Sequence, residues 1–429
     1  MWVLTFALFT NLLPITALAD AEGGDCGICP PSECECVPCG PDCECALCDP
    51  DGAMGFALTA SAAGVPDTSW YNTADANFTI TTAEQLAGLA QIVNDTDGLH
   101  ADEFFEGKTI NQAANIDLSA FGEAAAAWNS GRGWVPIGSA ATTSFTGTFD
   151  GHGHKITGLF INDPTLEFAG IFGHIGVPGA ATVTATVRRT GVYGEVSASS
   201  SAGLLVGFAE NSRIEQSYSQ GKVTLRGTSN NAGGLVGGII NRSIIENCWS
   251  SADVTHAGTS GNRRWVGGVI GFVGQTSTAR FLYATGRVSG FNSVGGVAGG
   301  NNQGDWTQAA TIQNIIALNP SITRNGTEGD GRTVGRWNVS NNALAGILAW
   351  DGIIGIGGGL MWSGGAANNR AGLDKNAAQI REPAFWTTAG GFTANWDTNI
   401  WTIEYGSLPG LFGKSNGGAA TAHKPHPIS

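Results

Sequence analysis

The chain has little charge and few of the residues that build helical surfaces. Only 13% of its 429 residues are charged and it contains only 3 methionines, whereas glycine occurs 65 times. Helical surfaces are normally rich in Lys and Glu, so this composition favours a β-structured body with Ser, Thr and Asn on its surface. The net charge is −14. Neither half of the chain has the basic surface that nucleic acid requires, so nucleic acid is not an expected partner.

Long apolar runs are also lacking, apart from one at the start. Residues 1–19 are apolar and uncharged and end in Ala-Leu-Ala before Asp20. This pattern predicts a secretory signal peptide, although the usual Lys or Arg near its start is missing. A retained membrane anchor is the alternative, but the run is short and no positive flank follows it. The expected mature chain is therefore secreted or associated with the cell surface, without a membrane span.

Cysteine is nearly confined to one short stretch. Residues 20–50 hold eight of the 9 cysteines and include two copies of C-E-C-x-x-C. Behind a signal peptide, this pattern predicts a disulfide-linked module, since an oxidising compartment consumes free thiols. A zinc-thiolate cluster is the rival interpretation, because the same spacings suit zinc. The spacing does not define the pairing. The candidate disulfide residues are Cys26, Cys29, Cys34, Cys36, Cys39, Cys43, Cys45 and Cys48.

The glycines are concentrated in five short apolar runs that recur through the middle of the chain. Their closing glycines are spaced by 28 to 34 residues. A period of this size is typical of solenoids, in which each unit buries its apolar face by stacking on its neighbour. The sequence therefore predicts an all-β fold, a right-handed parallel β-helix from about Thr109 to about Ile322 followed by a less regular segment. The runs are Ala169–Gly173, Gly203–Gly207, Gly233–Gly237, Gly267–Gly271 and Gly295–Gly299.

Side chains after each glycine run predict vertical rows in the stack. An apolar residue is followed nine positions later by Val in four units, for example Val187 and Val196, and these pairs predict aliphatic ladders in the core. The same alignment stacks Tyr218, Trp249 and Tyr283. This aromatic row is either core packing or, if it faces solvent, a platform for sugar rings.

The combined motifs resemble proteins that contain the GLUG motif, a repeat of bacterial surface and secreted proteins. The resemblance rests on the glycine runs, on FTITTAEQLAGLAQIVN at Phe78–Asn94, on WVPIG at Trp134–Gly138, and on the closing pattern within Phe385–Leu411. It covers about Thr79 to Leu411 and excludes the Cys-rich stretch. The resemblance implies a right-handed β-helix of the kind found in adhesins and in non-catalytic parts of large surface proteases.

These patterns divide the chain into five expected segments. Within the solenoid segment, Thr82–Val93 predicts an amphipathic helix that caps the stack, with Thr82 and Gln85 forming a capping box. The polar C-terminal tail shows no anchor. The segments are a signal peptide at 1–19, the Cys-rich module at 20–50, a linker at 51–70, the solenoid at 71–411 and the tail at 412–429.

One short motif could hold a metal ion. Asp150, His152 and His154 alternate along Asp150–His154, and two His residues two positions apart could ligate zinc or copper with the carboxylate. Asp-Gly is also strong turn chemistry, so a structural corner is the competing interpretation. No third outlying ligand has an obvious spacing, and no metal or other cofactor is expected.

No motif supplies a catalytic centre. The charges of the repeats are scattered singly, and no carboxylate pair stands at the spacing that polysaccharide lyases or hydrolases need. Three functions therefore remain. We expect a non-catalytic solenoid that binds a glycan or a cell-surface protein. A structural spacer of the cell surface and a polysaccharide-degrading enzyme are the alternatives.

Overall fold

The computed structural model describes residues 64–413, except 126–127, 228–229, 259–263, 302–308, 328–330, 338–342, 358–364 and 389. All of these residues belong to one compact unit, Ala60–Ser429. The predicted signal peptide, the Cys-rich module with its eight candidate disulfide residues, and the tail beyond residue 413 lie outside the described residues. Residues 64–70, which the sequence placed in a linker, include Trp70, whose ring packs edge-on against Phe78.

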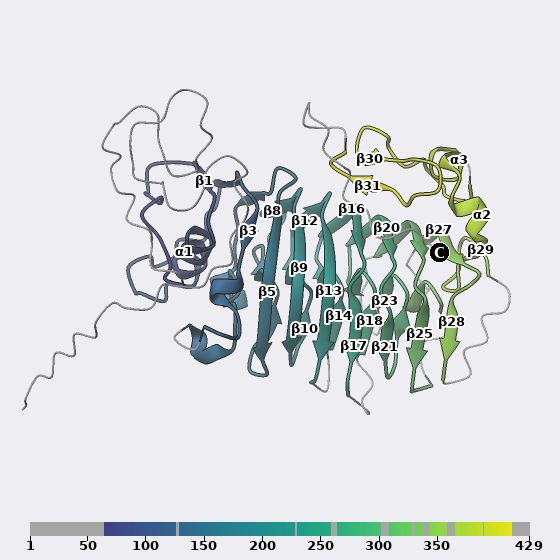
Figure 1. Cartoon of the computed structure of the whole chain (residues 1–429), viewed down its shortest axis with the longest axis horizontal. Helices are drawn as coiled ribbons and strands as arrows, with labels where there is room; N and C mark the ends of the chain where they lie inside the picture. The colour runs from purple at the N-terminus through teal and green to yellow at the C-terminus, as the bar shows by residue number, and fades with distance from the viewer. Residues whose placement is uncertain are drawn as a thin grey trace, which may run out of the picture. The chain divides into compact units, whose positions relative to one another are not determined.

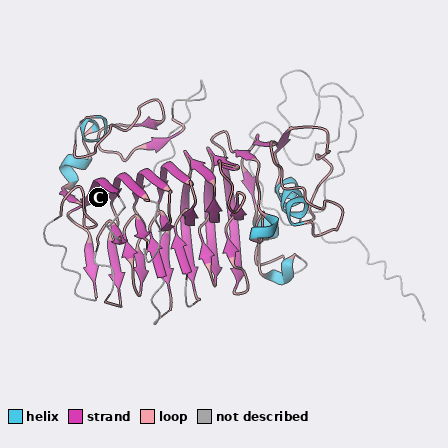
Figure 2. Ribbon diagram, turned by 180° about the vertical axis from the view of Figure 1, so that it is seen from behind, coloured by secondary structure: helices cyan, strands magenta, loops and turns pink. Residues whose placement is uncertain are grey.

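The described chain is a parallel β-solenoid whose strands stack side by side in four ladders, which run across the picture in Figures 1 and 2. The predicted fold class is therefore confirmed. The first two ladders belong to one 18-stranded sheet. The first ladder contains β1 (Asn77–Ile80), β2 (Thr109–Gln112), β4 (Thr148–Asp150), β8 (Ala185–Arg188), β12 (Ser212–Glu215), β16 (Ile244–Ser250), β20 (Thr278–Ala284), β24 (Thr311–Ala317), β27 (Ala343–Trp350) and β29 (Leu373–Lys375).

The second ladder lies beside the first in the same sheet. It contains β3 (Ile116–Asp117), β5 (Lys155–Asp163), β9 (Gly191–Ala198), β13 (Tyr218–Leu225), β17 (Asp253–His256), β21 (Val288–Gly290), β25 (Ser321–Arg324) and β28 (Ile354–Ile356). The stack begins with β1 and continues to β28, and β29 adds a last strand to the first ladder, so the predicted limits at Thr109 and Ile322 were too narrow at both ends.

The third and fourth ladders complete each coil. The third contains β6 (Phe168–Ala169), β10 (Ser201–Ala202), β14 (Asn230–Gly233), β18 (Arg264–Gly267) and β22 (Val294–Gly295). The fourth contains β7 (Phe172–Ile175), β11 (Val206–Glu210), β15 (Val236–Ile240), β19 (Ile270–Val273), β23 (Ala298–Gly300) and β26 (Val334–Arg336). The predicted stacking of the glycine runs is confirmed, since Leu205 N–H donates to Leu235 O at 3.0 Å and Leu235 N–H donates to Val269 O at 3.0 Å.

The closing glycines are required because there is no room for a Cβ atom at these positions, and not because of their backbone φ angles. A Cβ atom on Gly237 would lie 2.3 Å from the carbonyl oxygen of Gly207, and one on Gly271 would lie 2.5 Å from that of Gly237. Real Cβ atoms essentially never come this close to an oxygen. The closing glycines therefore mark the positions where the backbones of successive coils are in close contact, and their spacing is the period that indicated the fold.

The predicted aliphatic ladders fill the interior. Val187, Ile214 and Ile245 are in direct register in the first ladder, and Val196, Val223 and Val254 are in register in the second. All six are at most 1% exposed. Full burial of each such side chain is worth roughly 1.5–3 kcal/mol, so these rows are a main source of stability.

The predicted helix is α1 (Ala83–Asn94), whose apolar face is buried. The side chain of Thr82 accepts a hydrogen bond from Gln85 N–H, as expected. The return bond differs from the predicted capping box, because Gln85 Oε1 accepts from Thr81 N–H instead of Thr82 N–H. The remaining described helices are the 3₁₀ turns Ser119–Phe121, Asn129–Gly131 and Ala141–Thr143, and α2 (Ala377–Ile380) and α3 (Pro383–Thr387).

The first ladder bends at one left-handed residue in several successive coils. Asn247 has a φ of 53°, and Gln216 and Phe281 hold the equivalent positions with φ of 47° and 54°. Strict alternation would have placed Glu246 and Cys248 on one face. The bend at Asn247 separates them, so Cys248 is fully buried and inert. Burial raises the pKa of its thiol well above the ordinary value.

The segment after the last coil turns back along this bend. It contains α2, α3 and a hairpin of β30 (Trp401–Thr402) and β31 (Gly410–Leu411), drawn in yellow beside the ends of β16 and β20 (Figure 1). Trp401 Nε1 donates to Asn247 Oδ1 at 3.1 Å, and Thr393 N–H donates to Asn314 Oδ1 at 2.7 Å. Left-handed residues of two coils, those of β16 and β24, thus hold the C-terminal segment. We call residues 376–412 the C-terminal cover.

Candidate functional site: a charged column on the solenoid

The aromatic row is formed but does not reach solvent. Tyr218 pairs with Trp249 and Trp249 with Tyr283, and the ring planes of these two pairs are within 12° and 5° of parallel. All three side chains are 0% exposed. The C-terminal cover lies over them, and Tyr283 donates its hydroxyl hydrogen to Pro409 O at 2.5 Å. The row is therefore core packing, and the sugar platform that required an exposed row is not formed.

The metal candidates are engaged in a corner. Asp150 Oδ1 accepts the N–H of His152, which has a φ of 49°, and this is the turn that the competing interpretation proposed. His152 Nε2 lies within 2.9 Å of Asn111 Oδ1. Burial and the charge of His152 lower the pKa of His154. Across the described ranges, no three His, Cys, Asp or Glu side chains converge as a metal site.

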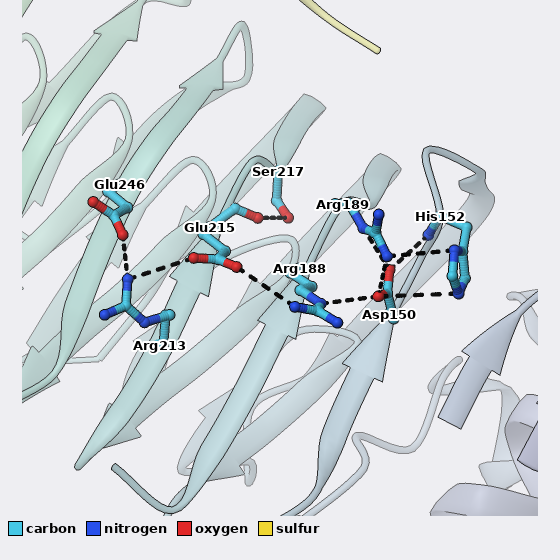
Figure 3. A network of polar contacts seen from close by, with 8 residues as sticks. All are labelled: Asp150, His152, Arg188, Arg189, Arg213, Glu215, Ser217 and Glu246. Atoms are coloured by element: carbon cyan, nitrogen blue, oxygen red, sulfur yellow. Dashed lines mark hydrogen bonds and ion pairs between the residues drawn. The ribbon is translucent and has the colours of Figure 1, made fainter. Parts of the chain in front are cut away.

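Asp150 instead belongs to a set of charged side chains that follow one another from coil to coil on the outer face of the first ladder (Figure 3). The backbone register places Asp150 beside Arg188, Arg188 beside Glu215, Glu215 beside Glu246, and Glu246 beside Arg280. Strand spacing of about 4.8 Å brings these side chains into contact from coil to coil. We call the set the charged column: Asp150, Arg188, Arg189, Arg213, Glu215, Glu246 and Arg280.

The charged column is a chain of alternating ion pairs. Arg188 Nε donates to Asp150 Oδ2 at 2.9 Å, and Arg189 Nε donates to Asp150 Oδ1 at 2.8 Å. Arg213 bridges Glu215 and Glu246, and Arg280 Nε donates to the other oxygen of Glu246 at 2.7 Å. Each acid therefore has at least one guanidinium partner.

The acids are deep in the column and the arginines are outside. The side chain of Asp150 is only 2% exposed and that of Glu246 only 9%, whereas those of Arg213 and Arg280 are 33% and 41% exposed. Burial alone would raise the pKa of Asp150. The hydrogen bond from Arg189, the His152 N–H and the charges of both arginines outweigh burial and hold that pKa below its usual value. The face that solvent meets is thus rich in guanidinium groups with free N–H donors.

Sequence reasoning missed this column because it judged the charges one at a time. In the sequence Glu215, Glu246 and Arg280 look like scattered single charges, and the basic doublet Arg188–Arg189 has no acidic pair at a motif spacing. The sequence does hold a signal for the column, because each of its members in the register directly follows a residue of the predicted aliphatic ladder. These members are Arg188, Glu215, Glu246 and Arg280. Placing the charges in the coil alignment would have found the column.

A Ser–His contact is the other arrangement that the sequence did not suggest. Ser144 Oγ and His174 Nδ1 share a hydrogen bond, and both residues are buried, at 5% and 2% exposed. Burial lowers the pKa of His174 to about 4. The rings of Phe168 and Phe208 pack against that of His174. A nucleophile must be reachable by substrate, so this buried contact is structural.

Comparisons with known proteins support the fold and leave the family open. No family model matches the chain. Halomucin from Haloquadratum walsbyi is 32% identical over 139 residues, which is 32% of this chain and 1% of that protein. A protein of Evansella cellulosilytica named "Putative Gly-rich membrane protein" is 35% identical over 102 residues, 24% of this chain and 10% of that protein. The chain thus matches only a small part of either relative's length.

A solved structure resembles much of this chain in its fold. The crystal structure named for a "putative immunoglobulin A1 protease" from Bacteroides ovatus superposes with a TM-score of 0.56 at 20% identity. The match covers 76% of this chain and 89% of that one. Likeness at this identity concerns the fold. In the described part of the chain, no helix is long and apolar enough to cross a membrane.

Proposed function

We propose that the protein is a secreted or cell-surface solenoid that binds an extended polar ligand, a glycan or a surface partner, on the outer face of the first ladder. The charged column carries this proposal, because it repeats guanidinium donors from coil to coil over a row of buried acids. A repeated ligand meets a repeated surface in many weak contacts, and their sum gives useful avidity.

Three further observations support a surface role. Residues 1–19 have the pattern of a signal peptide, and the chain resembles GLUG-motif proteins. The relatives that it matches in part are named halomucin and "Putative Gly-rich membrane protein". The outer face of the first ladder also carries threonines beside the charged column. Thr148 and Thr186 are in register, as are Thr278 and Thr311.

The chemistry of the described carboxyl groups favours binding without turnover. A glycosidase needs a general acid whose pKa is raised. The carboxyl groups of Asp97, Glu103 and Asp150 all have lowered pKa values, and Asp150 is held by two arginines. A polysaccharide lyase or hydrolase therefore remains the weaker alternative, and a structural spacer of the cell surface is the stronger one.

A paired substitution tests the binding face while the two most buried acids of the charged column, Asp150 and Glu246, keep a guanidinium partner; Glu215, 18% exposed at its side chain, loses both of its own. In the Arg188→Gln/Arg213→Gln variant, Asp150 retains Arg189 and Glu246 retains Arg280. We expect the full chain to bind a subset of glycans on an array and the double variant to lose at least about tenfold in affinity, since charge-assisted hydrogen bonds are among the strongest.

Arg287→Gln is the matched control. Arg287 belongs to an exposed pair with Asp253 on the second ladder, and its side chain is 69% exposed. Its substitution should leave binding unchanged. Absence of binding to any glycan or surface extract would favour the spacer, and release of shortened oligosaccharides from a polysaccharide would favour the enzyme.

A further inference from the structure

A hollow of about 460 Å³ is lined by Lys375 and by residues of the C-terminal cover, none of which belongs to the charged column. Its walls come from the end of β29, from α2 and α3, and from the turn at Gly390–Gly391. The volume is within the range of small-molecule sites. The side chains that line it are Lys375, Gln379, Glu382, Phe385 and Thr388.

Lys375 is held in this hollow without a carboxylate partner. Its backbone is fixed by the register with Trp350 and by its carbonyl oxygen, which accepts from Asp351 N–H at 3.0 Å. Its ammonium group lies 5.9 Å from the ring centre of Phe385. Among the residues that the structure describes, no acid lies within ion-pairing distance of Lys375.

A glycine makes room for this ammonium group. Gly391 has a φ of +120°, and a Cβ atom there would lie 3.2 Å from Lys375 Nζ and 3.1 Å from its Cε. Another residue at this position would be strained by its φ and would crowd the end of the lysine side chain, which would have to shift by a few tenths of an ångström. The ammonium group of Lys375 thus lies near both Phe385 and Gly391.

Glu382 lines the same hollow and is exposed to solvent. It is the N-cap residue of α3, yet its side chain makes no capping hydrogen bond. It forms no ion pair within the described ranges, and so an acid and a base face one hollow without neutralising each other. A ligand that offers an anionic group to one side and hydroxyl hydrogens to the other would satisfy both.

We propose that this hollow binds a sugar residue that carries a carboxylate, a hexuronic acid unit. The carboxylate accepts hydrogen bonds from the Lys375 ammonium group. Glu382 accepts from ring hydroxyls. The apolar face of the sugar ring lies toward Phe385, whose ring is part of the wall. A neutral sugar would leave Lys375 without its counter-charge, so the site distinguishes acidic from neutral saccharides.

Calorimetric titration of the full chain tests the site. The probes are a disaccharide that ends in glucuronic acid and its counterpart that ends in glucose. The wild-type protein should bind the acidic disaccharide at least tenfold more tightly. Lys375→Met keeps the length of the side chain and its packing on Phe385, and it should abolish this preference. Glu382→Gln should weaken the binding of both probes.

Two controls separate this site from the lateral face. Lys222→Met removes an exposed lysine of β13 and should change neither titration. The Arg188→Gln/Arg213→Gln variant should bind the acidic disaccharide as the wild type does, whatever becomes of the proposed function. Equal affinity for the two probes, no binding, or full binding by a Lys375→Met protein with a native melting temperature would each overturn the proposal.

Discussion

The charged column and the aromatic row come from the same coils, three residues apart in the sequence, but one is exposed to solvent and the other is buried. In the charged column, Arg280 is 41% exposed at its side chain, whereas in the aromatic row its near neighbour Tyr283 is 0% exposed. The left-handed residue between them, Phe281 in this coil, turns the two rows onto different sides of a corner. The C-terminal cover then occupies one side only. The repeated coils thus produce both a charged and an aromatic row of side chains. A row that the C-terminal cover buries stabilises the fold, and a row that it leaves exposed is available to a ligand.

The largest expected effect is the loss of stability when a side chain of the aromatic row is truncated. Trp249→Ala would leave a cavity between the stacked rings of Tyr218 and Tyr283 and beneath the C-terminal cover. Large-to-small changes of a buried Trp cost about 3–5 kcal/mol, so we expect a loss of that size in urea unfolding. Glycan binding per folded molecule should not change. A loss below about 1 kcal/mol would mean that the row is not core.

Both rows depend on the spacing of the coils, which the closing glycines set. Gly237→Ala would place a methyl group 2.3 Å from Gly207 O, so a backbone must move. We expect a loss of about 1–3 kcal/mol in thermal or urea unfolding. Gly238→Ala is the matched control in the same strand, because the nearest atoms to its Cβ, at 3.0 and 3.1 Å, belong to the side chain of Phe208. Equal losses in both variants would show that the clash is not what requires Gly237.

A third environment is that of His174, a polar side chain buried between rings of the third and fourth ladders. Its folded-state pKa of about 4 lies below the ordinary 6.5, so the unfolded chain binds the proton first as the pH falls. Stability is therefore fully present above pH 6.5 and is lost as the pH falls toward 4. We expect a loss of about 2 kcal/mol between pH 7 and pH 5.

Urea unfolding across this pH range measures the effect. His174→Gln should flatten the dependence. A wild-type protein whose stability is the same at pH 7 and pH 5 would contradict the buried neutral state of His174.

Much of this arrangement could be predicted from the sequence, because it is repeated in the sequence. The glycine period gave the solenoid, the valine spacing gave the register, and the alignment of Tyr218 with Trp249 placed the aromatic row. Repetition carries no information on what a non-repeated segment will cover. The contact between Trp401 and Asn247 joins residues 154 positions apart. For the same reason, the hollow around Lys375 lay beyond any spacing argument.

The smallest expected effect concerns the stability contribution of the charged column. Arg213 bridges two acids, but its side chain is 33% exposed and Glu246 keeps Arg280 when it is removed. Exposed ion pairs contribute about 0–1 kcal/mol, so Arg213→Gln should cost less than about 1 kcal/mol, and this cost should shrink further in 1 M salt. Urea unfolding at low and high salt measures both quantities. A loss above about 2 kcal/mol would make the column a structural brace instead of a surface kept for a ligand. Trp249→Ala should lower the free energy of unfolding strongly and Arg213→Gln only slightly. The two variants together therefore distinguish the aromatic row, which stabilises the fold, from the charged column, which stays available to a ligand.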